Sequence, residues 1–257
     1  MTLKERVLAK ERLIGCYVQL TDVANSRIMG LLGYDFIWVD TEHSYMSYET
    51  LYAHILSIKS TGTPVIVRAP QHDLTATKRI LEMGVDGIIF PMIRTCAEAD
   101  SVIASTLYPP RGTRGFGPMG AVDYGIRDVL EYIESDRDSL CRFIQVEHKD
   151  MLDNLDAIAE NEDIDGYMVG MNDLSASYGL LGQATCEKMS EVLRQTVCRL
   201  HEKGKYVALA SGGYTEDILS HWTSFGIDML VAGADFDFIR DGARRNQETM
   251  TRIFKNS

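Results

Sequence analysis

Short apolar segments recur along the chain and are separated by longer amphipathic ones. The apolar segments are nearly continuous rather than alternating, which is typical of strands buried on both faces of a parallel sheet. The expected strands cover residues 14–20, 34–40, 64–68, 85–91, 141–147, 164–170, 206–210 and 227–233. The expected helices cover residues 22–32, 48–60, 73–83, 96–105, 151–159, 187–203 and, at the end of the chain, 236–254.

Eight strands joined by helical crossovers predict an α/β protein, specifically a (β/α)8 or TIM barrel that forms a single domain over residues 1–257. A doubly wound open sheet shows the same alternation. The first expected strand is not followed by a G-x-G-x-x-G pattern, which argues against a dinucleotide-binding sheet.

The longest segment without an expected element is the glycine-rich stretch 107–120, which carries Arg111 and Arg114. Loops of this length inside a compact domain are usually functional or disordered. We place this segment after a strand, on the face where barrel enzymes carry their chemistry, and expect it to act as a substrate lid.

The chain is acidic, because 37 Asp and Glu residues against 26 Lys and Arg give a net charge of −11 over 257 residues. This argues against nucleic acid or an anionic membrane surface as the main partner, since both require clustered positive charge. Five widely spaced cysteines without a C-x-x-C pair indicate neither a disulfide framework nor a zinc site. The charged N-terminus lacks the apolar core of a signal peptide, so we expect a cytoplasmic protein.

Polar residues gather where the expected strands end, which is where a barrel carries its reactive groups. They are Gln19, Asp40, His43, Arg68, Gln145, Glu147 and Asp173. Arg68 ends an apolar strand, so its charge must meet an acidic neighbour or an anionic ligand. His43 follows the strand that ends in Asp40, a position suited to a general base.

Glu147 and Asp173 each follow an apolar strand, where an isolated carboxylate is costly unless a cation compensates its charge. Two hard oxygen ligands, with room for water and a chelating substrate, suit Mg²⁺. The alternative is that both residues cap the helices that begin just after them, since acidic residues are common at helix starts.

Six short motifs occur in order along the chain. They are V-D-T-E-H-S (39–44), V-R-A (67–69), F-P-M (90–92), Y-P-P-R-G-T-R-G (108–115), Q-V-E (145–147) and V-G-M-N-D-L-S (169–175). Their order and spacing resemble those of the HpcH/HpaI aldolase/citrate lyase family, in particular its class II, metal-dependent pyruvate aldolases. One departure is that the family's Gly-Pro-x-Asp-Leu-Ser motif lacks its proline here, where Met171 follows Gly170.

The resemblance implies a metal site and a substrate site. Glu147 and Asp173 would bind Mg²⁺, Mn²⁺ or Co²⁺. The contacts to the substrate are expected from Gln19, Asp40, Gln145, Asn172 and Ser175.

The resemblance also implies three catalytic roles. His43 matches the family's base, and Arg68 matches the arginine that contacts the keto oxygen and stabilises the enolate. Glu82 stands where the family has a carboxylate, usually an aspartate, that polarises the histidine.

The implied reaction is reversible cleavage of a 4-hydroxy-2-oxo acid to pyruvate and an aldehyde, through an enolate that the metal and Arg68 stabilise. Alternatives at the same metal site are oxaloacetate decarboxylation and macrophomate-synthase-like or acyl-CoA lyase chemistry. Two further alternatives to the proposed reaction are a Schiff-base aldolase that uses Lys149 and a barrel that binds a metabolite without turnover.

The last expected helix is apolar, with Phe236, Phe238, Ile239 and Phe254, and can close the barrel's own floor or cross to a neighbouring subunit. The resemblance implies exchange of this helix within a homo-oligomer, a hexamer built as a trimer of dimers.

Overall fold

The computed structural model describes residues 1–71 and 73–255, and within them the strands close into a parallel barrel in which β1 pairs with both β2 and β8. The strands are β1 (Leu13–Val18), β2 (Phe36–Asp40), β3 (Val65–Arg68), β4 (Gly87–Phe90), β5 (Cys141–Val146), β6 (Gly166–Gly170), β7 (Tyr206–Ser211) and β8 (Met229–Ala234). The predicted (β/α)8 barrel is therefore confirmed.

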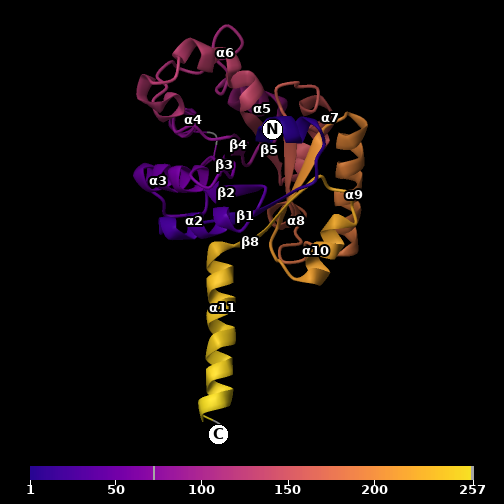
Figure 1. Cartoon of the computed structure of the whole chain (residues 1–257). Helices are drawn as coiled ribbons and strands as arrows, with labels where there is room; N and C mark the ends of the chain where they lie inside the picture. The colour runs from indigo at the N-terminus through magenta and orange to yellow at the C-terminus, as the bar shows by residue number, and fades with distance from the viewer. Residues whose placement is uncertain (72, 256–257) are drawn as a thin grey trace.

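Helices cover the barrel, apart from α11, which extends away from it (Figure 1). They are α1 (Leu3–Leu8), α2 (Val23–Leu31), α3 (Tyr48–Lys59), α4 (Leu74–Glu82), α5 (Cys96–Ala104), α6 (Val129–Ser139), α7 (Lys149–Ile158), α8 (Met171–Ser177), α9 (Glu187–Glu202), α10 (Glu216–Thr223) and α11 (Asp235–Met250). The sequence pattern does not predict α1, α6 and α10, because α1 and α10 are short and α6 is strongly charged.

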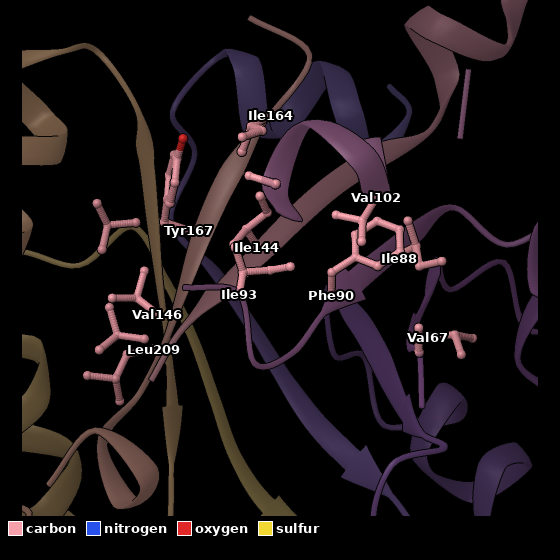
Figure 2. Packing of buried hydrophobic residues seen from close by; sticks show 14 of the residues in the cluster. Val67, Ile88, Phe90, Ile93, Val102, Ile144, Val146, Ile164, Tyr167 and Leu209 are labelled. Atoms are coloured by element: carbon pink, nitrogen blue, oxygen red, sulfur yellow. The ribbon is translucent and has the colours of Figure 1, made fainter. Parts of the chain in front are cut away.

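Two apolar layers hold the barrel together. Inside it, Trp38, Phe143 and Met168 belong to one buried cluster. Outside it, the strands pack against the helices, and Figure 2 shows Val102 of α5 close to Phe90 of β4. Strands β2 to β6 are buried at every position, which explains why their sequences are continuously apolar.

The outer layer is incomplete over β1 and β8. Ile14 of β1 is 54% exposed, and Leu230 and Ala232 of β8 are only partly buried. The helix that follows β8, α11, extends away from the barrel (Figure 1). Its exposed apolar side chains include Ile239 and Met250.

The segment 107–120 does not follow a strand, so the prediction of a lid over the strand ends is wrong. It follows α5 and leads, through a short helix (Gly120–Gly125) and α6, to the start of β5. A β-carbon at Gly84, in the turn that enters β4, would lie 3.1 Å from the α-carbon of Ala121. The residues after the segment therefore lie at the amino-terminal end of the barrel, opposite the strand ends where the polar residues gather.

A buried ion network holds this segment in place. Arg114 Nη1 lies 2.7 Å from Asp136 Oδ1, and Arg142 Nη2 lies 3.1 Å from Asp136 Oδ2. All three side chains are buried. Asp136 therefore links the segment 107–120, α6 and β5. Its carboxylate balances the charges of two guanidinium groups that are buried away from water.

The five cysteines are free, but only Cys16 and Cys141 are buried. Among the described residues, no helix has both the length and the apolar character needed to cross a lipid bilayer. The cytoplasmic location stays a prediction.

Replacing Asp136 with Asn should destabilise the fold strongly, by about 3–5 kcal/mol, because it leaves two buried guanidinium groups without a carboxylate. Urea titration of the free energy of unfolding measures this loss. The matched control is Asp163→Asn, whose partners Arg111 and Arg137 are about half exposed, and it should cost less than about 1 kcal/mol. Equal losses for the two variants would contradict the structural role of Asp136.

Candidate active site

The carboxyl ends of the strands surround a cavity of about 280 Å³. The residues expected at the site that line it are Gln19, Asp40, His43, Arg68, Gln145, Asn172 and Asp173. The parallel register explains this convergence, since Asp40 of β2 and Arg68 of β3 are direct neighbours across the sheet.

Arg68 is held in a fixed orientation. Its Nε and Nη2 donate to the two carboxylate oxygens of Asp40 at 2.9 and 2.6 Å. Its Nη1 lies 2.9 Å from Glu42 Oε2 and 3.5 Å from Gln145 Oε1. The guanidinium carbon lies 5.1 Å from the centre of the Trp38 ring. A carboxylate that binds a guanidinium at two points fixes its plane, so Arg68 presents a preorganised cation to the cavity.

Asp40 is buried and negatively charged. Gln19 Nε2 donates to Asp40 Oδ2 at 2.7 Å, and the backbone N–H of Glu42 donates to Oδ1 at 3.0 Å. Burial opposes ionisation, but the hydrogen bonds and charge of Arg68 outweigh it, and the pKa of Asp40 lies below its ordinary value. Gln19 and Asp40 therefore help to position Arg68 as well as lining the cavity.

The carboxylate next to His43 is Glu42, not Glu82. His43 Nε2 lies 3.8 Å from Glu42 Oε2, and the histidine side chain is 61% exposed. Glu82 ends α4, which runs antiparallel to the strands, and it lines a separate cavity with Arg79. Within one chain Glu82 does not reach His43, because α4 carries it away from the strand ends, and its role as the partner of His43 stays a prediction.

Glu147 follows β5 and is buried. Its Oε1 accepts a hydrogen bond from the Met92 backbone N–H, and its Oε2 accepts one from the Gln145 amide. Burial, together with the negative charges of Glu42 and Asp173, raises the pKa of Glu147 to about 7 although the Met92 hydrogen bond acts against it. Negative charge is therefore crowded around Glu147.

Asn172, Asp173 and Ser175 lie on α8, which begins directly after β6. Asn172 and Asp173 line the cavity, whereas the Ser175 hydroxyl is turned into the helix and donates to the Asn172 carbonyl oxygen at 2.8 Å. A β-carbon at Gly170, the last residue of β6, would lie 3.2 Å from Glu147 Oε2. The glycine therefore leaves room for the Glu147 carboxylate next to α8.

Helix capping does not account for the two carboxylates. The N-cap of α7 is His148, whose side chain accepts from the Asp150 backbone N–H. The N-cap of α8 is Gly170, with no capping side chain. Neither Glu147 nor Asp173 is therefore an N-cap residue, although Asp173 lies in the first turn of α8.

The donor set fits a hard divalent cation. Glu147, Asp173 and the Gln145 amide offer oxygen ligands, and the crowded negative charge is what a cation would relieve. Across residues 1–71 and 73–255, no three or more His, Cys, Asp or Glu side chains are grouped to hold a metal. An ion bound here would thus keep positions for water and for a chelating substrate, as Mg²⁺ commonly does.

Among the lining residues that were not expected at the site from the sequence are Tyr17, Trp38 and Asp237. The rings of Tyr17 and Trp38 pack against each other with their centroids 5.1 Å apart. Because Tyr17 and Trp38 lie within apolar strands, the sequence alone does not distinguish them from core residues. Asp237 lies in the first turn of α11, and only the closure of the barrel brings it to the site.

A barrel with this set of side chains at its strand ends defines a TIM-barrel enzyme, and comparison with known proteins identifies its class. The model of the HpcH/HpaI aldolase/citrate lyase family matches residues 13–232, so the chain belongs to that family. It is a carbon–carbon lyase.

Individual relatives agree with this assignment. A protein from Shigella dysenteriae serotype 1 (strain Sd197), named 5-keto-4-deoxy-D-glucarate aldolase, is 27% identical over 246 residues, which are 96% of this chain and 95% of the relative. The crystal structure of an HpcH/HpaI family protein from Burkholderia cenocepacia J2315 matches with a TM-score of 0.90 at 24% identity, covering 96% and 98% of the two chains. Macrophomate synthase matches with a TM-score of 0.85 at 21% identity, covering 98% and 91%. These two structures share the fold.

Replacing Asp40 with Asn should lower the free energy of unfolding by roughly 3 kcal/mol at pH 7, because it removes the main charge that balances buried Arg68. The folded-state pKa of Asp40 lies below its unfolded-state value of about 3.9, so its contribution is present above that value and is lost as the pH falls through the folded-state pKa. Urea titrations of wild type and variant should therefore show a difference that is constant from pH 7 to about pH 4 and narrows at lower pH. A difference that does not change with pH would contradict this role.

Proposed function

We propose that the protein is a divalent-metal-dependent aldolase that reversibly cleaves a 4-hydroxy-2-oxo acid to pyruvate and an aldehyde. The observation that carries this proposal is that Asp173 and the fixed guanidinium of Arg68 line one cavity, with Glu147 buried beside it and hydrogen-bonded to Gln145 of the lining. Such a site can bind a cation together with an anionic substrate, and it can stabilise negative charge that develops on the substrate.

Glu147 and Asp173 would hold the ion, with Gln145 beside them. When bound, a divalent cation supplies Lewis-acid polarisation of the 2-oxo acid. The 27%-identical relative from Shigella dysenteriae carries the name of an aldolase, which supports a reaction of this type for the present chain.

Arg68 would donate hydrogen bonds to the C2 oxygen of the substrate, where charge accumulates as the C3–C4 bond breaks. Asp40 and Trp38 already fix the guanidinium, so little reorganisation is needed during the reaction. The electron pair of the broken bond forms the enolate of pyruvate, and protonation at C3 then gives pyruvate.

His43 would accept the proton of the 4-hydroxyl group as C4 becomes the aldehyde carbonyl, and would return it in the synthesis direction. Glu42, 3.8 Å away, would orient the imidazole and stabilise its protonated form. In this assignment Glu42 is the carboxylate that polarises His43, a role that the resemblance implied for Glu82.

The geometry does not favour a Schiff-base mechanism. Lys149 is exposed at the start of α7, and no lysine is among the described residues that line the cavity. Borohydride reduction in the presence of pyruvate should therefore leave the protein unmodified, whereas EDTA should abolish turnover.

Replacing Glu147 with Gln, or Asp173 with Asn, should weaken Mg²⁺ binding by at least about 100-fold and remove pyruvate release to a similar extent. Calorimetric titration of Mg²⁺ in the presence of pyruvate measures the first effect, and pyruvate release from a panel of 4-hydroxy-2-oxo acids measures the second. Asp153→Asn, an exposed carboxylate on α7, is the matched control and should change neither. Tight Mg²⁺ binding in both site variants would refute the metal assignment.

We further infer that α11 packs onto a second copy of the chain in a homo-oligomer, a hexamer built as a trimer of dimers. Two complementary features support this: the outer faces of β1 and β8 are incompletely covered at Ile14 and Leu230, and α11 exposes Ile239 and Met250. Exchange of α11 between copies would bury both sets of apolar side chains.

Sedimentation equilibrium should then give a mass several times the 28.8 kDa of one chain. The double variant Ile239→Glu and Met250→Glu should shift the mass toward the monomer, because it places charges on the apolar face of α11. Gln247→Glu, at an exposed polar position of the same helix, is the control and should keep the wild-type mass. A monomeric wild-type protein would contradict the inference.

A further inference from the structure

A second, smaller cavity adjoins the candidate active site, and we call it the side cavity. Its volume is about 230 Å³. Gln19, His43 and Phe236 line both the side cavity and the main cavity. Because these three residues border both, the two cavities lie side by side, with the imidazole of His43 at the boundary between them.

The side cavity is largely apolar. Beyond the shared residues, it is lined by Leu20 and Tyr45 and by the small side chains of Thr21 and Ser44. None of these four described residues carries a formal charge. The side chains of Leu20, Tyr45 and Phe236 are all exposed within the chain. An apolar group that enters the side cavity would cover this apolar surface and leave water itself, and both changes are favourable.

The position of His43 decides which part of the substrate reaches the side cavity. In the proposed reaction His43 accepts the proton of the 4-hydroxyl group, so C4 lies next to its imidazole. The 2-oxo acid end of the substrate is held in the main cavity, where Arg68 meets the C2 oxygen. The remaining substituent of C4, which becomes the chain of the aldehyde, therefore extends past His43 into the adjoining side cavity.

We propose that the side cavity is the subsite for the chain of the aldehyde, and that it selects an apolar chain. This proposal rests on the proposed aldolase function. A chain bound there contacts Leu20, Tyr45 and Phe236 and is removed from water. Each methylene group that fits should then raise kcat/KM by about fourfold, because binding energy gained away from the reacting bond also stabilises the transition state.

A series of straight-chain aldehydes tests the subsite in the synthesis direction, with pyruvate and Mg²⁺. Ethanal, propanal, butanal and pentanal differ by one methylene group at each step and carry no other functional group. We expect kcat/KM to rise along the series and to be at least about tenfold higher for pentanal than for ethanal. The quotient of these two values is called the chain-length ratio below.

The variant Leu20→Asn should reduce the chain-length ratio by at least about threefold, because it replaces an apolar wall of the side cavity with a polar side chain of similar size. Leu31→Asn is the matched control. Leu31 is likewise exposed, but it lies on α2 and lines neither cavity, so the ratio should not change.

A second variant, Ser44→Leu, reduces the space in the side cavity. The Ser44 hydroxyl oxygen is buried and has no hydrogen-bond partner among the described residues, so its removal breaks no hydrogen bond. The larger side chain should lower the chain-length ratio by at least about threefold, because pentanal no longer fits as well as ethanal.

The outcomes separate the apolar subsite from the aldolase function. Values of kcat/KM that stay level or fall from ethanal to pentanal in the wild-type protein would overturn the apolar subsite while leaving the aldolase function intact. A rising series with an unchanged ratio in Leu20→Asn and Ser44→Leu would show that the chain binds elsewhere. Failure to condense pyruvate with any of the four aldehydes would overturn the proposed function, and the subsite with it. The wild-type series tests the subsite even where a variant does not fold.

Discussion

The structure depends on how one cation, Arg68, is shared among the carboxylates at the mouth of the barrel. Asp40 binds it at two points, and Glu42 binds it at a third. Glu147 is left with an amide and a backbone N–H as its hydrogen-bond donors. Burial and the charges of Glu42 and Asp173 raise the pKa of Glu147 to about 7, and a further positive charge beside it would act in the opposite direction. The chain itself supplies no cation that binds Glu147 directly, and this is why a metal ion is part of the proposed function.

Much of this arrangement could be predicted from the sequence, because strands buried on both faces have continuous apolar sequences and their carboxyl ends converge in a barrel. That logic places Asp40, Arg68 and Gln145 on the cavity, as the structure does. It is misapplied to the segment 107–120, which follows the helix expected over residues 96–105 rather than a strand and therefore lies at the other end of the barrel. The role of Glu82 is implied by the resemblance alone and stays a prediction.

The roles of other site residues could not be predicted from the sequence, for different reasons. Trp38 lies in an apolar strand, and nothing in its sequence context shows that its ring supports a guanidinium. Glu42 is adjacent in sequence to His43, and only the fold at the end of β2 shows that it contacts Arg68 as well. Asp237 reaches the cavity because β8 closes against β1, a contact between the two ends of the chain. The same closure places the base of α11 at the site.

The most direct test of the central claim is anomalous diffraction from crystals grown with Mn²⁺ and pyruvate. The account predicts one strong anomalous peak within coordination distance of both Glu147 and Asp173, with the pyruvate next to Arg68. Ordered pyruvate in the cavity without such a peak, or a peak held by other side chains, would contradict it.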